Sequence, residues 1–95
     1  MVIGVCRLEL DLMDNHSLKG KRSVVKRVIQ RIRNRFNVAM AEVDGLDHHT
    51  VAVLGFVVVG NEKPFVNRQV DTILNAVEGL GLAPLRDSHY VIEQY

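Results

Sequence analysis

The chain has few cysteines, few aromatic residues and no long apolar run. Its 95 residues include one cysteine, no tryptophan, three phenylalanines and two tyrosines. Cys6 alone cannot form an internal disulfide, and no Cys/His cluster has zinc-site spacing, so a disulfide-stapled scaffold is excluded and no metal site is expected. The longest apolar run, residues 51–59, is too short to span a bilayer, and no signal-peptide pattern opens the chain. We therefore expect a cytoplasmic protein that contacts no membrane.

The composition indicates a single domain over residues 1–95. Hydrophobic residues make up 47% of the chain and charged residues 24%, with 12 basic and 11 acidic side chains. A chain of this length buries roughly 60–68% of its unfolded surface, enough for one core but not for a large enclosed active site. There is no Walker loop, dinucleotide-binding fingerprint or serine with an activating signature. We therefore expect no enzymatic activity and no cofactor.

Apolar periodicity predicts the order strand, helix, strand, strand, helix, strand. Ser17 and Asn61 are expected to cap the two helices. The strands are expected at residues 1–13, 38–43, 50–60 and 85–95, and the helices at residues 18–37 and from the Asn61 cap to Gly79. This order favours an α+β fold of the ferredoxin-like βαββαβ type, a four-stranded antiparallel sheet with both helices on one face.

The two strands expected at the centre of this sheet are apolar on both faces. Residues 2–6 and 51–59 show no alternation, although one face of such a sheet has no helix to cover it. Small residues such as Gly4 and Ala52 are expected to reduce the cost of exposing that face. We nevertheless expect a partner, most simply a second copy forming a homodimer, to cover part of it.

Basic residues are concentrated in the first predicted helix. Residues 19–35 contain eight basic and no acidic residues, whereas the rest of the chain has four basic and 11 acidic ones. Like charges four residues apart cost a helix about 0.2–0.5 kcal/mol per pair, so the pattern calls for a compensating interaction. Phosphate groups of a nucleic acid are one explanation, and pairing with the protein's own acids or simple solvation is the other. The candidate phosphate-binding residues are Lys19, Lys21, Arg22, Lys26, Arg27, Arg31, Arg33 and Arg35.

Other residues capable of chemistry have simpler interpretations. His48 and His49 are adjacent in a predicted loop, with no further residues at ligand spacing, and are expected to be solvated. Cys6 lies in an apolar stretch and is assigned to the core. Phe56 is the only aromatic residue on the inner strands, whereas a sheet that stacks RNA bases needs two or three. The helix rather than the sheet is therefore expected to contact any RNA.

Short motifs in a fixed order give the chain a family resemblance. They are SLKGKR at residues 17–22, RNRFNV at 33–38, AEVD at 41–44, and Leu54-Gly55 followed by Asn61. In this order they resemble the YlxP-like family of bacterial single-domain proteins of unknown function. The resemblance implies a ferredoxin-like domain without known enzymatic activity, often encoded near translation and ribosome-maturation factors. Gly20 departs from the family pattern, and glycine in a first helical turn is expected to weaken it by up to about 1 kcal/mol.

The sequence thus leaves two functional hypotheses. The first is a non-catalytic RNA-associated or ribosome-associated domain, with ribosomal RNA as the implied partner, that binds phosphates through its basic first helix. The alternative is a homo-oligomeric module that binds a small ligand or a protein through its open apolar sheet face.

Overall fold

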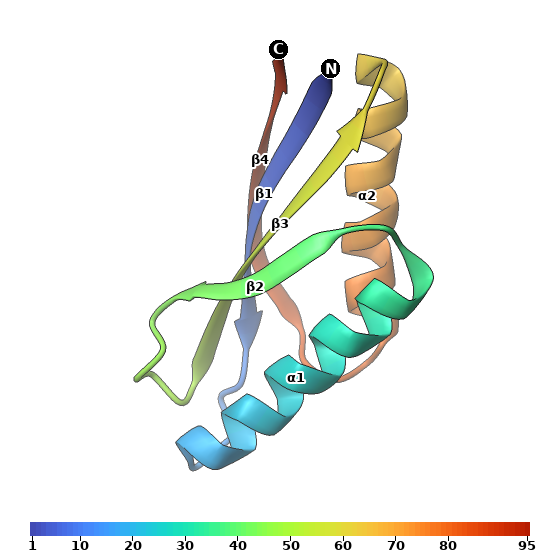
Figure 1. The fold of residues 1–95 in the computed structure, drawn as a ribbon. Helices are drawn as coiled ribbons and strands as arrows, with labels where there is room; N and C mark the ends of the chain where they lie inside the picture. Colours follow the sequence, from blue (N-terminus) through green and yellow to red (C-terminus); the bar gives the residue numbers. More distant parts are fainter.

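Six elements occur in the predicted order (Figure 1). The computed structural model describes all 95 residues. The elements are β1 (Val2–Asp11), α1 (Leu18–Arg35), β2 (Ala39–Asp44), β3 (Val51–Gly60), α2 (Lys63–Gly79) and β4 (Leu85–Gln94). The strands form one antiparallel sheet in the order β2-β3-β1-β4, and both helices lie on the same side of it. This is the expected ferredoxin-like βαββαβ arrangement, with β1 and β3 at the centre.

The hydrophobic core lies between the sheet and the two helices. On β1 the even-numbered residues from Val2 to Leu10 are buried, because successive strand side chains point to opposite faces. The helices supply apolar residues at helical spacing, namely Val25, Val28 and Ile32 from α1 and Val66, Val70, Ile73 and Val77 from α2. Cys6 is in this core, as predicted. Neither helix is long and apolar enough to cross a membrane.

Gly4 and Ala52 lie on the helix side of the sheet, so the expectation that they ease exposure of the open side was wrong. A Cβ atom at Gly4 would lie 2.9 Å from Val66 Cγ1 and 3.0 Å from Val70 Cγ2, because α2 packs directly on β1 there. Ala52 is fully buried. Gly55 lies on the open side instead, opposite Arg7 on β1.

The helix ends follow the sequence signals at one helix but not at the other. Ser17 caps α1 as predicted, since its hydroxyl oxygen accepts a hydrogen bond from the Gly20 amide at 3.0 Å. Asn61 does not cap α2. Glu62 occupies the cap position without a side-chain hydrogen bond, and Pro64 stands in the first turn, where its missing N–H is not needed.

Candidate nucleic-acid interface

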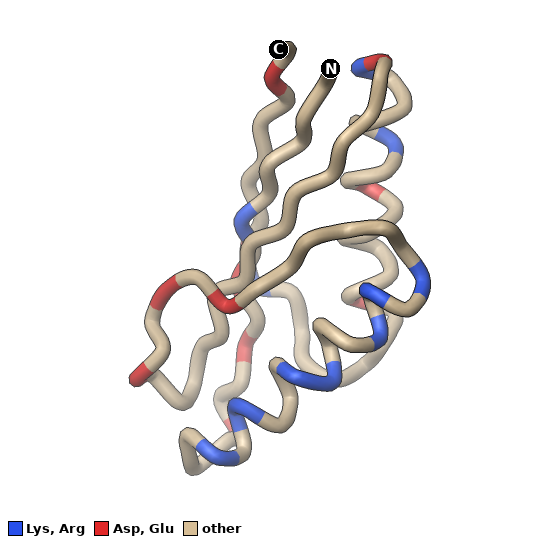
Figure 2. The backbone as a smooth tube through the Cα atoms, viewed as in Figure 1, with Lys and Arg blue, Asp and Glu red and all other residues tan.

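The outward side of α1 is a continuous basic surface. The helix buries its apolar stripe against the sheet, and the basic residues between the stripe positions therefore point to solvent. Figure 2 shows Lys and Arg along the whole helix. Seven of the eight candidate residues are exposed: Lys19, Arg22, Lys26, Arg27, Arg31, Arg33 and Arg35. We call these seven residues the α1 basic surface.

The α1 basic surface has two edges. Arg22, Lys26 and Arg33 line a groove of about 480 Å³ that also includes Glu42 of β2. The other edge is the ridge made by Arg27 and the arginines four and eight residues later, which spans about 12 Å at the helical rise of 1.5 Å per residue. The last residue of this ridge, Arg35, borders a hollow of about 370 Å³ shared with α2.

None of the seven residues pairs with a carboxylate. The ion pairs of the protein join Arg7 to Asp44 at 3.1 Å, Lys21 to Glu42 at 2.9 Å, and Arg86 to Glu9 at 4.0 Å. Arg35 instead places its guanidinium carbon 5.2 Å from the ring centroid of Phe36, a cation–π distance. Pairing with the protein's own acids therefore does not explain the surface, which leaves solvation or an external anion.

Lys21 lies inside the protein, so its assignment as a phosphate contact was wrong. Its side chain is 1% exposed. The ammonium Nζ donates to the carbonyl oxygens of Gly45 at 2.7 Å, His48 at 2.5 Å and Val51 at 3.2 Å. It also lies 2.9 Å from Oε2 of Glu42, a buried oxygen with no other partner. Lys21 is thus a structural residue that fixes the connection between β2 and β3.

The sequence did contain a signal for the burial of Lys21. It precedes Val25 by four residues and Val28 by seven, the spacing of the apolar stripe. A charged residue at a stripe position calls for an internal partner, and Glu42 supplies it.

A second contact holds the same loop, residues 45–50, against the start of α1. The Asn15 amide Nδ2 donates to the carbonyl oxygens of Ser17 and His49, each at 2.6 Å. Gly20 makes room for this side chain, because a Cβ atom there would overlap Asn15 Oδ1. The glycine at position 20, which departs from the family pattern, is therefore explained by its close packing against Asn15. His48 and His49 both lie exposed in the loop, as predicted.

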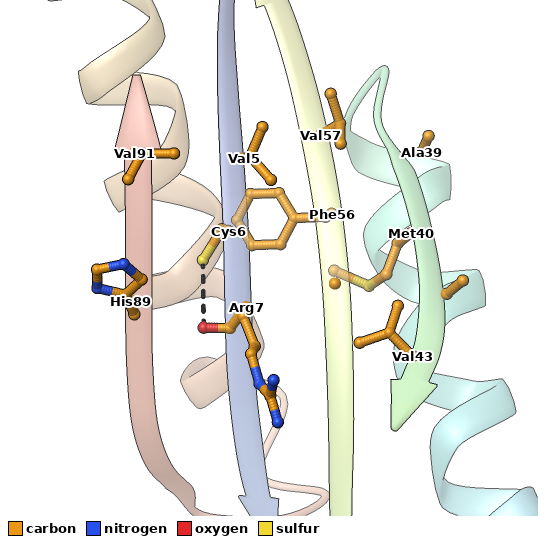
Figure 3. Close-up of a pocket in the computed structure, with 12 residues that line it drawn as sticks. Val5, Cys6, Arg7, Ala39, Met40, Val43, Phe56, Val57, His89 and Val91 are labelled. Carbon is orange, nitrogen blue, oxygen red and sulfur yellow. Dashed lines mark hydrogen bonds between the residues drawn. The ribbon is translucent and has the colours of Figure 1, made fainter. Parts of the chain in front are cut away.

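The helix-free side of the sheet contains a hollow of about 510 Å³ (Figure 3). Val5, Val43 and Val57 are among its apolar lining residues, and Gly55 contributes no side chain to fill it. Phe56 is 1% exposed, so its ring belongs to the core and is not available for base stacking. Burial also raises the pKa of the Cys6 thiol to about 11, which makes it a poor nucleophile at neutral pH.

Comparison with known proteins identifies the family. A family model described as a protein of unknown function, DUF503, matches residues 3–90. The chain belongs to the DUF503 family. It is 29% identical over 77 residues to the uncharacterized protein YlxP of Bacillus subtilis (strain 168), an alignment that covers 81% of this chain and 84% of that protein. The YlxP-like resemblance is thereby confirmed, and the family brings no assigned activity.

Solved structures share the fold at low identity. The de novo designed protein Foldit4 aligns with a TM-score of 0.53 and 15% identity, over 99% of this chain and 97% of that one. A VAO-type flavoprotein from Myceliophthora thermophila also aligns with a TM-score of 0.53, at 16% identity, over 98% of this chain but only 18% of its own. At these identities the likeness concerns the fold alone.

Proposed function

We propose that the protein is a non-catalytic domain that binds the phosphate backbone of RNA through the α1 basic surface. The observation that carries this proposal is the presence of seven exposed cations on one helix, none within 4.0 Å of a carboxylate. The 11 acidic residues lie elsewhere in the chain. A polyanion supplies the opposite charge that the fold does not.

The shape of the surface favours backbone contact over base recognition. α1 has 18 residues, so it extends about 27 Å and can meet several phosphates along one strand or across a groove. The open sheet face shows no exposed aromatic ring on its inner strands, so the base stacking used by sheet-based RNA modules is not available. Phosphate contacts position a protein on RNA without reading its sequence. Structured ribosomal RNA is the first partner to test.

The test is fluorescence-anisotropy binding to structured ribosomal RNA and to single-stranded RNA, titrated from about 50 to about 200 mM salt. The variant carries Arg27→Glu, Arg31→Glu and Arg35→Glu. Each lost phosphate contact reduces the slope of log affinity against log salt by about 0.9 on a duplex, so the variant should lose about 2.7 units of slope and at least about 100-fold in affinity.

A matched control reverses three basic residues outside α1, Lys63→Glu, Arg68→Glu and Arg86→Glu. Both variants change the net charge equally, and they differ in the position of the charges and in the exposed Arg86–Glu9 ion pair at 4.0 Å, which only the control removes. The α1 variant should fold normally by far-UV circular dichroism, because its three arginines are exposed. Equal losses in the two variants, or no binding by the wild type even at low salt, would overturn the proposal.

A further inference from the structure

The open side of the sheet carries a row of exposed valines. Val5 of β1 pairs with Val57 of β3 and with Val91 of β4, so the three side chains lie next to one another across the sheet (Figure 3). They are 42%, 36% and 43% exposed, respectively. A contiguous apolar patch of this kind marks an interaction surface.

The rows on either side of the valine row complement each other. One row contains Ile3, Val59 and Glu93, and Val59 protrudes with 61% of its surface exposed. The other row contains Arg7, Gly55 and His89 and borders the hollow. One row therefore offers the protruding Val59 and the Glu93 carboxylate, and the other offers the hollow and the His89 imidazole, while Arg7 is already paired with Asp44 at 3.1 Å.

We infer that a second copy of this chain packs face to face on the open side, related by a two-fold axis that runs along the valine row. Rotation about this axis places each strand over the same strand of the partner, and each flanking row over the other flanking row of the partner. Val59 then faces the hollow at the partner's Gly55, and Glu93 faces the partner's His89. Each contact occurs twice, as a two-fold interface requires.

A second copy covers more of the open face than a small ligand would. At about 3.4 Å per residue and 4.8 Å between strands, the open face has a flat footprint of about 600 Å² per copy. With the axis along the valine row, the parts of β1, β3 and β4 within three residues of that row overlap, about 340 Å² per copy or about 700 Å² for two, which is the size of a weak, transient interface. A small molecule in the 510 Å³ hollow would leave the protruding Val59 in water. α1 lies on the opposite side of the sheet, so this dimer leaves its basic surface free.

Sedimentation velocity from about 1 to about 200 μM tests the inference, since an interface of this size is expected to dissociate in the micromolar range. The mass should rise from 10.7 kDa towards twice that value. Val57→Asp should weaken association at least about 100-fold, because it places two carboxylates against each other at the centre of the interface. The control, Leu46→Asp in the β2–β3 loop, changes a residue that is 59% exposed but lies off the face, and should have no effect.

A cross-linking experiment decides the matter if Val57→Asp fails to fold. A thiol at a two-fold centre meets its own copy, so Val57→Cys should give a covalent dimer with a short thiol-specific cross-linker. Wild-type protein should give no covalent dimer because its only thiol is buried, and Leu46→Cys should give none because that position lies off the face. Ammonium sulfate should strengthen this apolar association, whereas salt weakens RNA binding, so the two proposals can fail independently. A protein that stays monomeric, a dimer that a folded Val57→Asp leaves intact, or an absent Val57→Cys cross-link would overturn the inference.

Discussion

Replacing Lys21 by methionine should destabilise the fold far more than the same change elsewhere on α1. Methionine keeps a long apolar side chain but removes the ammonium that contacts three carbonyl oxygens and Glu42. Removing one partner of a buried ion pair costs about 3–5 kcal/mol. Because the Glu42 side chain retains 17% exposure, we expect the lower end, about 3 kcal/mol.

This loss is large for a protein of this size. A domain of 95 residues has a free energy of unfolding of about 5–15 kcal/mol. A change of about 3 kcal/mol lowers Tm by roughly 12–24 °C. Lys26→Met removes the same charge from an exposed position of the helix and should change stability by no more than about 0.5 kcal/mol.

Urea unfolding followed by far-UV circular dichroism measures both variants. Glu42→Gln, alone and together with Lys21→Met, completes a double-mutant cycle that isolates the ion pair from the three carbonyl contacts. If Lys21→Met cost less than about 1 kcal/mol, as an exposed lysine would, the buried placement of its ammonium would be refuted.

Two further predictions concern Gly20, Gly79 and Cys6. Gly20→Ala should lower the free energy of unfolding by about 1 kcal/mol, because the new Cβ atom displaces Asn15 from two hydrogen bonds. Gly79→Ala should instead raise it by about 0.5–1 kcal/mol, because the space around the new Cβ atom is open and alanine favours the helix. Urea unfolding measures both changes, and a higher free energy of unfolding for Gly20→Ala would contradict the packing of Asn15 against Gly20. Cys6 should react with a thiol reagent at pH 8 only after denaturation, because burial raises its pKa from 9.0 to about 11. The stability that the buried thiol contributes should be fully present below pH 9 and should decline towards pH 11, because the thiol of the unfolded chain ionises first. Thermal unfolding of Cys6→Val should show a smaller decline over this pH range.

The fold could be predicted because its signals are local. The alternation of residues 7–11 in β1 and the helical spacing of the apolar residues in α1 and α2 indicate the buried side of these segments in their own sequence. Helix capping was predicted correctly at Ser17 and wrongly at Asn61. Two residues, Asn61 and Glu62, separate the end of β3 from Lys63 at the start of α2, so the cap position falls on Glu62, although Asn61 is the better capping residue.

The site could be predicted only in part, because burial of a single side chain depends on distant backbone. The sequence predicted eight basic residues of this helix as phosphate contacts, and the structure places seven of them on the outward side of α1. The partners of Lys21 lie 24, 27 and 30 residues further along the chain and are main-chain carbonyls, which no residue type reveals. The side of the sheet on which Gly4 and Ala52 lie was likewise not predictable, because in a strand that is apolar on both sides the sequence does not show which alternate residues face the core.

The run of eight basic residues therefore contains two different kinds of charge. At position 21 a compact ammonium with three donors suits converging carbonyl oxygens better than the planar fork of arginine would. Five of the seven outward residues are arginines, the side chain whose fork matches phosphate oxygens in pairs. Lys21 forms an ion pair with Glu42, the acidic residue that lines the groove beside Arg22, Lys26 and Arg33. The outward residues are thus left without an internal counterion. Because like charges on one helix repel, this arrangement is most stable when an external anion occupies the surface, and the RNA phosphate backbone that we propose as the partner would supply that anion.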